Sequence, residues 1–386
     1  MLLAAATAFA QPLRLTPDDP AADGLVSEAL RKTPELDAAR AALEAARRRV
    51  EPARTLPDPM ASFNFQNDEQ VVMLSQPLPW PGKLALAGKA TASEVRELEI
   101  GSVDRAALTI EARVRTAWYD LVLARALDHL AEERRETATQ IEATTRDRYA
   151  AGLAVQQDVI RAQVELARVD ELKSEQRAAI AGRLAELNRL LGRPHDAALD
   201  TAAELPAIAP LPPIESIVAG ALTRSPESAA ARQGIETGRL RVDLAKKNFL
   251  PDFVVSGGVG TMWQVGVGVS LPLWQNKRQR NQLAEAEARV AEQTAQTDLV
   301  ARELELRTRE RIAQLERANE VAALYRDKVI PLDELSYESA LASYRAGKVP
   351  FITVFDAVSA LYGDRASYLA RLAEAAKWRV AIDELR

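Results

Sequence analysis

The chain has 386 residues, with 50 Lys and Arg against 55 Asp and Glu, so its formal net charge is −5. Nucleic-acid-binding proteins usually carry an excess of clustered basic residues, and this slightly acidic balance does not indicate one. There is no cysteine, which excludes disulfides and thiolate metal sites and leaves no lipidated N-terminal cysteine in this sequence.

Residues 1–20 are predicted to be a truncated secretory signal followed by a proline-bearing N-terminal lead-in. Residues 1–10 are almost all apolar, and Ala8-Phe9-Ala10 has the small-x-small form of a signal-peptidase site. The basic n-region is missing, so a chance similarity is the alternative. No apolar run reaches the length of about 18 residues that a transmembrane helix needs, and none is predicted.

A first repeat is predicted over residues 21–205, beginning with a helix from about Leu25 to Ala53. Pro57 and Pro59 end that helix. Apolar and polar side chains then alternate at every second position, which is the period of a strand. This pattern predicts a β-hairpin over residues 60–77.

A very long helix is predicted over residues 83–151, which contain no proline. Apolar residues recur seven apart along it, at Val103, Ile110, Ala117, Ala124, Ala131 and Ala138. That spacing keeps one seam facing a partner helix, and at about 1.5 Å per residue the helix would reach roughly 100 Å. Gly152 predicts its end, and a return helix is expected over residues 153–191.

A proline-rich linker, residues 206–216, leads to a second repeat over residues 217–386. Its expected elements are a helix from about Ile217 to Asn248, a β-hairpin over 252–272, a long helix over 277–346 with a bend at Pro331, and a return helix over 350–385. Asp252 follows Asp58 by 194 positions, and Gly347 follows Gly152 by 195. So small a drift indicates a true internal repeat.

The strands are predicted to lie in a membrane. They approach the roughly 9–11 residues that cross a bilayer at a tilt, and one face is apolar while the other is small or polar, as in a barrel wall. Val267 is expected to face lipid and Gly266 the interior, and Trp80, Trp274 and Trp263 suit the membrane–water interface. The alternative is a soluble hairpin packed on helices, with the tryptophans in its core.

The order of helix, hairpin, very long helix, tip and return helix, run twice, resembles the TolC-type outer-membrane channels of tripartite efflux pumps. The resemblance covers about residues 25–386. Its most specific matches are residues 76–83, QPLPWPGK, and the tip segments AGL at 151–153 and AGK at 346–348. The string PWPGK at residues 79–83 is similar to the heavy-metal, CzcC-like branch of that family. The short strands and outer loops imply a minimal, open outer mouth.

What this resemblance implies is a mainly helical homotrimer in the outer membrane of a Gram-negative bacterium. Each protomer would add four strands to one twelve-stranded β-barrel and its helical hairpins to a periplasmic coiled-coil tunnel. The partners implied are a periplasmic adaptor protein, an inner-membrane pump of the RND type and outer-membrane lipid.

The function implied is an exit duct that passively conducts substrates, with heavy-metal cations as the expected cargo and drug or protein export as the alternative. A non-membrane periplasmic coiled-coil scaffold is the alternative from a different class, and it would partition as a soluble protein. No catalytic constellation is present, so neither an enzyme activity nor a cofactor is expected. His129 lies beside acidic residues on the long helix, but a metal site usually needs three or four ligands, and none is predicted.

The resemblance also assigns roles at the tips. Acidic residues just beyond the tip glycine narrow the periplasmic aperture of such channels, and Asp356 matches one such position. Thr353 stands where another aspartate is common, Asp158 is its equivalent in the first repeat, and Tyr344 is placed at the same aperture. The tip residues expected to contact the adaptor are Gly152, Leu153, Gly347 and Lys348. The alternative for both aspartates is that they cap or solvate the first turn of a return helix.

Overall fold

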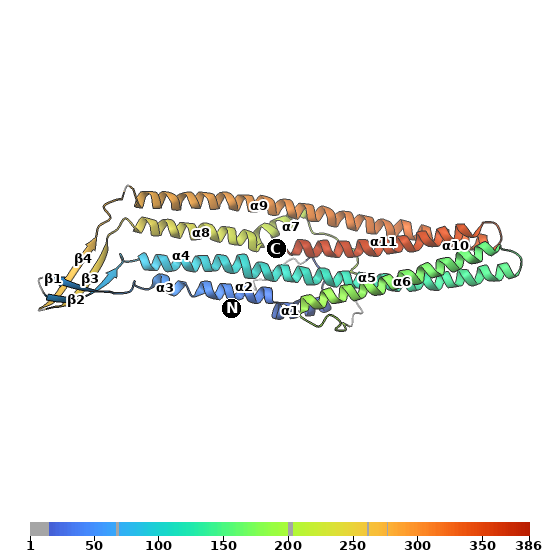
Figure 1. Cartoon of the computed structure of the whole chain (residues 1–386). Helices are drawn as coiled ribbons and strands as arrows, with labels where there is room; N and C mark the ends of the chain where they lie inside the picture. The colour runs from blue at the N-terminus through green and yellow to red at the C-terminus, as the bar shows by residue number, and fades with distance from the viewer. Residues whose placement is uncertain (1–14, 67–68, 200–203, 261, 276) are drawn as a thin grey trace, which may run out of the picture. The chain divides into compact units, whose positions relative to one another are not determined.

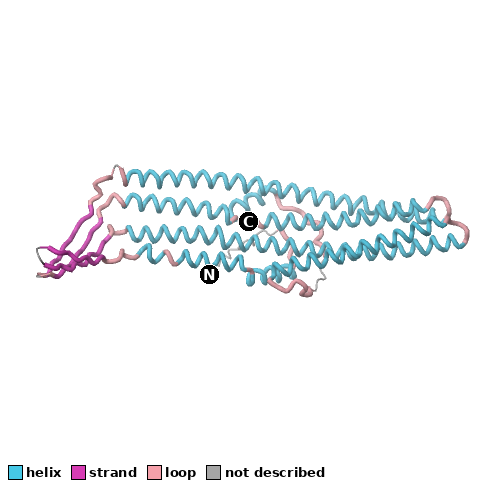
Figure 2. The backbone as a smooth tube through the Cα atoms, in the orientation of Figure 1, coloured by secondary structure: helices cyan, strands magenta, loops and turns pink. Residues whose placement is uncertain are grey.

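The computed structural model describes residues 15–66, 69–199, 204–260, 262–275 and 277–386. The described residues form long helices and one four-stranded sheet, which confirms the predicted fold class for the single chain (Figures 1 and 2). Residues 1–14, which carry the expected signal sequence, lie outside the described residues.

The chain divides into two compact units, and these do not coincide with the two sequence repeats. Unit 1 takes the described residues up to Thr33, Leu108–Val218 and Arg307–Leu385, and unit 2 takes Pro34–Ala107, Ala219–Leu306 and Arg386. Each unit therefore contains segments of both repeats. The repeats are units of sequence, whereas packing joins one repeat to the other.

Unit 2 combines the sheet with helices that lead away from it. Its helical elements are α2 (Pro34–Arg47), α3 (Val50–Arg54), α4 (Lys83–Leu98), the π-helical segment η1 (Glu99–Asp104), α8 (Pro226–Lys247) and the first part of α9 (Gln279–Leu324). Small residues let α8 pack closely, because a Cβ on Gly238 would lie 2.9 Å from Val290 Cγ2 on α9. The hydroxyl groups of Ser93 and Thr237, 2.8 Å apart, join α4 to α8.

The sheet of unit 2 is antiparallel throughout, in the order β1-β2-β3-β4. Its strands are β1 (Met60–Gln66), β2 (Glu69–Leu78), β3 (Asp252–Val259) and β4 (Trp263–Ser270). The β2–β3 pair joins the two repeats, so β1 and β4 form the edges. Each edge strand presents one row of backbone groups that no strand of this chain pairs among the described residues.

Unit 1 is helical in its described residues. It contains α1 (Pro20–Lys32), nearly all of α5 (Arg105–Ala150), α6 (Gln156–Leu191), the start of α7 (Ile214–Arg224), the end of α9, the π-helical segment η2 (Tyr325–Val329), α10 (Ile330–Arg345) and α11 (Phe351–Asp383). One core cluster gathers Leu15, Ile217 and Ile382 from three distant parts of the sequence. The Asp383 carboxylate accepts the N–H groups of Leu15 and Thr16 and so fixes the first described residues onto the end of α11.

The heptad seam predicted for the first long helix is buried for most of its length. The buried residues of this seam on α5 are Ile110, Ala117, Ala124, Ala131 and Ala138, and Val114 and Leu121 beside them are buried as well. The helix runs from Lys83 to Ala150 as α4, η1 and α5 without a coil interruption. The seven-residue pattern therefore identified the correct face.

Prolines divide two segments that the sequence predicted as single helices. The segment 25–53 is three helices, with an extended residue at Thr33 before Pro34. The segment 217–248 breaks in the same way at Ser225, before Pro226. The residue before a proline is disfavoured in the α conformation, which explains the breaks at Thr33 and Ser225. The bend expected at Pro331 stays a prediction; the π-helical segment η2 ends two residues before this proline.

Candidate functional sites at the sheet and at the helix tips

One face of the sheet exposes a continuous set of apolar side chains. Residues directly opposite one another in register share a face, so Phe63, Val72, Val259 and Trp263 form one row across the four strands. The exposed members of this apolar face are Phe63, Val72, Leu74, Val255, Val259, Trp263, Val265, Val267 and Val269. Exposing so large an apolar surface to water is unfavourable, and soluble monomers rarely do so. Such patches usually mark a contact with lipid or with another protein.

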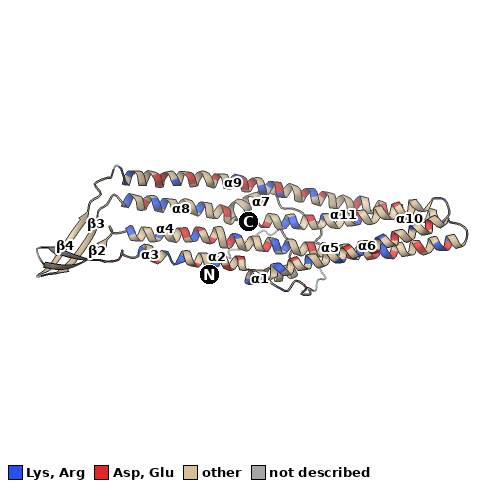
Figure 3. Ribbon diagram, viewed as in Figure 1, with Lys and Arg blue, Asp and Glu red and all other residues tan. Residues whose placement is uncertain are grey.

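The opposite face is mostly small or polar, with Met60 on β1 and Met73 on β2 among its apolar members. Its central row is Met60, Ser75, Ser256 and Gly266, and the next row is Ser62, Met73, Gly258 and Gln264. Val267 therefore lies on the apolar face and Gly266 on the other, and Val267 is 72% exposed. The strands are nearly free of charged residues, whereas both signs of charge cover the helices (Figure 3). This division has the chemistry of a wall between an apolar and an aqueous phase.

The three tryptophans assigned to an interface differ in their surroundings. Trp263 at the start of β4 and Trp274 after its end are 77% and 74% exposed. Trp80 is half-buried, and its ring stacks on Phe253 with 5.7 Å between centroids. The assignment of all three to a membrane interface stays a prediction. Within the part of the chain that is described, no helix combines the length and apolar character needed to cross a membrane.

In unit 1 the two helical hairpins end in the same backbone motif. Gly152 and Gly347 adopt φ angles of +71° and +73°, a left-handed conformation that favours glycine. The N–H of Leu153 donates to the Arg148 carbonyl at 2.8 Å, and the N–H of Lys348 donates to the Ser343 carbonyl at 2.9 Å. All four tip residues predicted to meet an adaptor are exposed. That contact itself stays a prediction.

Arg148 joins the two tips, a role that no sequence pattern predicts. Its guanidinium donates to the carbonyl of Arg345 at the end of α10 and to that of Leu153, the latter at 3.0 Å. It also lies over the Tyr344 ring, 4.8 Å from the centroid. One cation on α5 therefore holds the ends of both hairpins.

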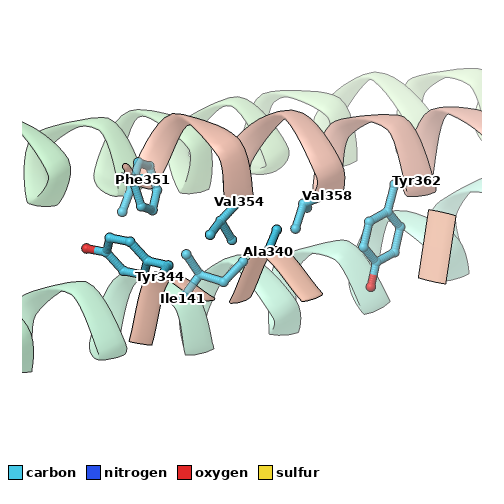
Figure 4. Close-up of a cluster of buried hydrophobic side chains, with 8 residues drawn as sticks. Ile141, Ala340, Tyr344, Phe351, Val354, Val358 and Tyr362 are labelled. Atoms are coloured by element: carbon cyan, nitrogen blue, oxygen red, sulfur yellow. The ribbon is translucent and has the colours of Figure 1, made fainter. Parts of the chain in front are cut away.

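Tyr344 lies in the core of the tip rather than on its surface. It is 3% exposed, and its ring meets that of Phe351 edge-on at 5.7 Å (Figure 4). Ile141, Val354 and Val358 belong to the same core, which joins α5, α10 and α11 and also includes Ala162 of α6. In the single chain Tyr344 thus supports the tip from inside, and burial does not favour the aperture role predicted for it.

The aspartates assigned to the entrance lie near the starts of the return helices. Asp356 and Thr353 are exposed on α11, and Asp158 is partly exposed on the first turn of α6. Among the described residues, Asp356 has neither an ion-pair partner nor a hydrogen-bond partner for its carboxylate. The N-cap positions are Val155 and Pro350, so neither aspartate caps its helix. This leaves the Asp356 carboxylate free to face a channel or bulk water.

The described residues contain no group of three or more His, Cys, Asp or Glu that could hold a metal ion. His129 is exposed and contacts Glu133 at 3.2 Å.

Comparisons with known proteins agree with this architecture. Residues 217–385 match the family described as outer membrane efflux protein. The cobalt-zinc-cadmium resistance protein CzcC of Cupriavidus metallidurans is 24% identical over 91% of this chain and 86% of its own length. The fusaric acid resistance protein FusA of Burkholderia cepacia is 28% identical over 61% of this chain but only 47% of its own. The crystal structure of CusC aligns with a TM-score of 0.77 at 17% identity, covering 96% of this chain and 92% of CusC.

Proposed function

We propose that this chain, which has the fold of the TolC-type channels and whose residues 217–385 match the outer membrane efflux protein family, is one protomer of an outer-membrane exit duct. The resemblance expected from the sequence is supported by the family match over residues 217–385, by the similarity to CzcC over most of the chain, and by the fold that the chain shares with CusC. The observation that carries the proposal is the sheet of unit 2, with an exposed apolar face and a small, polar opposite face.

Four strands with two open edges do not form a closed structure. Unpaired backbone groups are not tolerated in hydrocarbon, so the sheet would have to close with copies of itself. As the resemblance to TolC-type channels implies, the duct would be a homotrimer, with one twelve-stranded barrel in the outer membrane and its helices in the periplasm. A periplasmic adaptor and an inner-membrane pump of the RND type complete the system, and the hairpin tips meet the adaptor.

The cargo favoured by the nearly full-length similarity to a cobalt-zinc-cadmium resistance protein is a heavy-metal cation. A duct needs no resident metal site to conduct metal ions, since transport depends on the size and field of the pore. Drug export is the second candidate, and the partial similarity to a fusaric acid resistance protein favours it.

The test of the duct is assembly and conduction. The purified chain should sediment as a trimer in detergent, fractionate with outer membranes and give ion-conducting channels in planar bilayers. A monodisperse monomer that needs no detergent would instead support the coiled-coil scaffold.

The test of the cargo is growth. A strain that keeps its pump and adaptor but lacks its own duct should regain resistance to cobalt, zinc or cadmium salts when it expresses this chain. Restored resistance to fusaric acid alone would assign the duct to drug export.

A further inference from the structure

The sheet of unit 2 meets its helices at a charged junction. Lys83 begins α4 just after β2, and its ammonium lies 2.8 Å from Asp252 Oδ1 at the start of β3. Asp252 Oδ1 also accepts the N–H of Trp80 at 2.7 Å. The Trp80 ring stacks on Phe253, the next residue of β3. These contacts tie the second strand of the first repeat to the first strand of the second repeat.

The duplication supplies the same turn a second time. The N–H of Lys83 donates to the Trp80 carbonyl at 3.0 Å, and the N–H of Lys277 donates to the Trp274 carbonyl at 3.1 Å. Trp274 and Lys277 both follow their counterparts by 194 positions. Lys277 therefore occupies, after β4, the place that Lys83 occupies after β2.

Among the described residues, the second copy of this turn has no ion pair equivalent to that of Lys83 with Asp252. The residue equivalent to Asp252 is Asp58, again 194 positions away, and it lies two residues before the start of β1. Lys277 and Asp58 are both exposed, and neither has an ion-pair partner among the described residues. Trp274 is 74% exposed, whereas its counterpart Trp80 is half-buried.

The strand order explains why these groups do not meet. Asp58 adjoins β1 and Lys277 follows β4, and these strands are opposite edges of the sheet. The two side chains carry opposite charges, and the equivalent residues Lys83 and Asp252 form an ion pair where β2 meets β3. A second copy with its β1 edge along this β4 edge would bring the two groups together.

We propose that Lys277 of one copy pairs with Asp58 of the neighbouring copy, and that Trp274 packs at this contact. The junction formed inside the chain by Lys83 and Asp252 thereby recurs between copies. The inference rests on the proposed function only in that the sheet closes with copies of the chain. It adds which residues join the edges, and the site is incomplete without the second copy.

Applying the β2–β3 pairing to the contact between copies also predicts the register of β4 of one copy against β1 of the next. Ser75 lies opposite Ser256 in the β2–β3 pair, and their counterparts in the other repeat are Ser270 and Ser62. Ser270 of one copy therefore lies opposite Ser62 of the next. This register continues both faces of the sheet across the contact, because both serines lie on the small, polar face. A slip of one residue would place apolar side chains on the polar face.

Cysteine cross-linking tests the register, since the chain has no cysteine of its own. Opposed residues on antiparallel strands have Cα atoms about 4.5–5.5 Å apart, a distance at which disulfides form. The variant with both Ser62→Cys and Ser270→Cys should give dimers and trimers on oxidation that a reductant returns to monomers. The in-chain pair Ser75→Cys with Ser256→Cys should oxidise but stay monomeric on the gel, and the off-register pair Ser62→Cys with Gly266→Cys should give no ladder.

Charge exchange tests the junction. Lys277→Glu and Asp58→Lys should each lower the temperature at which the detergent-solubilised oligomer dissociates, and the double variant should recover most of that loss. An oligomer that forms normally, yet gives no ladder with the serine-site cysteines and no recovery in the double variant, would overturn this inference and leave the duct intact. Absence of any oligomer of the unaltered chain would overturn the proposed function as well.

Discussion

Neighbouring groups shift the pKa values of two carboxyl groups in unit 1 in opposite directions. Hydrogen bonds from Arg193 and then from Lys32 lower the pKa of Glu28 to about 2. In contrast, burial and the facing carboxyl group of Asp364 raise the pKa of Asp333. The folded state therefore favours the ionised form of Glu28 and the protonated form of Asp333. On acidification the protein loses the stability contributed by ionised Glu28, whereas protonation of Asp333 adds stability.

Replacing Glu28 with Gln should destabilise the protein in a pH-dependent way. Arg193 Nε and Lys32 Nζ reach the Glu28 carboxylate at 3.0 and 2.8 Å. A hydrogen bond to a charged group, as from the partly buried Arg193, contributes about 1.5–3 kcal/mol, whereas the exposed Lys32 adds about 0.3–0.5 kcal/mol as an i,i+4 pair. Because the folded pKa is the lower one, this stability is complete above the ordinary value of 4.5 and declines as the pH falls towards about 2.

The measurement is urea unfolding of the detergent-solubilised protein across pH. The variant should differ most from the unaltered chain at pH 7, and the two curves should approach each other in acid. Glu44→Gln, which removes an exposed pair with Arg48, should change little at any pH. Equal destabilisation by Glu28→Gln in acid and at neutrality would show that packing, not charge, is responsible.

The Asp356→Asn variant tests the entrance. If three copies of this exposed carboxylate converge near the axis, they attract cations and favour their passage. Removing the charge while keeping the shape should shift the reversal potential in a salt gradient towards zero and weaken block by divalent ions added on the periplasmic side. Asp158→Asn should act in the same direction but less. An unchanged reversal potential with Asp356→Asn would leave the aperture to other residues.

At the scale of elements, the apolar period predicted the long helices but not their interruptions. The seam on α5 depends on repeated spacing, which is present in the sequence itself. The helix breaks before Pro34 and Pro226 leave the spacing of apolar residues nearly unchanged. A prediction from this spacing alone therefore misses the breaks. Arg148 contacts a second tip that lies far away in sequence. No local pattern distinguishes it from the other arginines, so its role could not be predicted.

The strand β4 allows a matched test of its two faces. Arginine at a lipid-facing site near the bilayer centre costs about 2–4 kcal/mol, so Val267→Arg should reduce the amount of membrane-inserted protein. Gln264→Arg places the same charge on the opposite, polar face of the same strand and should insert nearly normally. The measurement is the ratio of membrane to soluble protein at equal expression. Equal insertion of the two variants would contradict the assignment of faces.

The link between the tips is tested by Arg148→Ala. The variant loses a cation–π contact worth about 0.5–1 kcal/mol and two hydrogen bonds to carbonyl groups, while the glycine-terminated turns remain. Amide hydrogen exchange in the segment around Gly347 should become several-fold faster. Arg146→Ala, which removes a pair with Glu142 inside the same helix, should leave that segment unchanged. Unaltered exchange in the Arg148 variant would mean that the hairpins are held independently.

At the scale of the whole molecule, duplication was readable from the sequence but packing was not. Spacings such as that of Asp58 and Asp252 showed two similar halves. They did not show that α4 of the first half packs on α8 of the second, or that Leu15 meets Ile382 in one core. Those contacts depend on which apolar faces meet in three dimensions, and a single sequence records each face without its partner.

The division of the chain into units that cross the repeats has a consequence for how the protein folds. Each unit needs segments from both halves, so the contacts that complete it have a large sequence separation and must overcome a high loop-closure entropy. The first half, made alone, would leave the partners of α4 and α5 missing, with apolar seams open to aggregation. A fragment of residues 15–205 should therefore be digested rapidly by trypsin, while the full chain resists. A fragment as protected as the full chain would show that each repeat folds by itself.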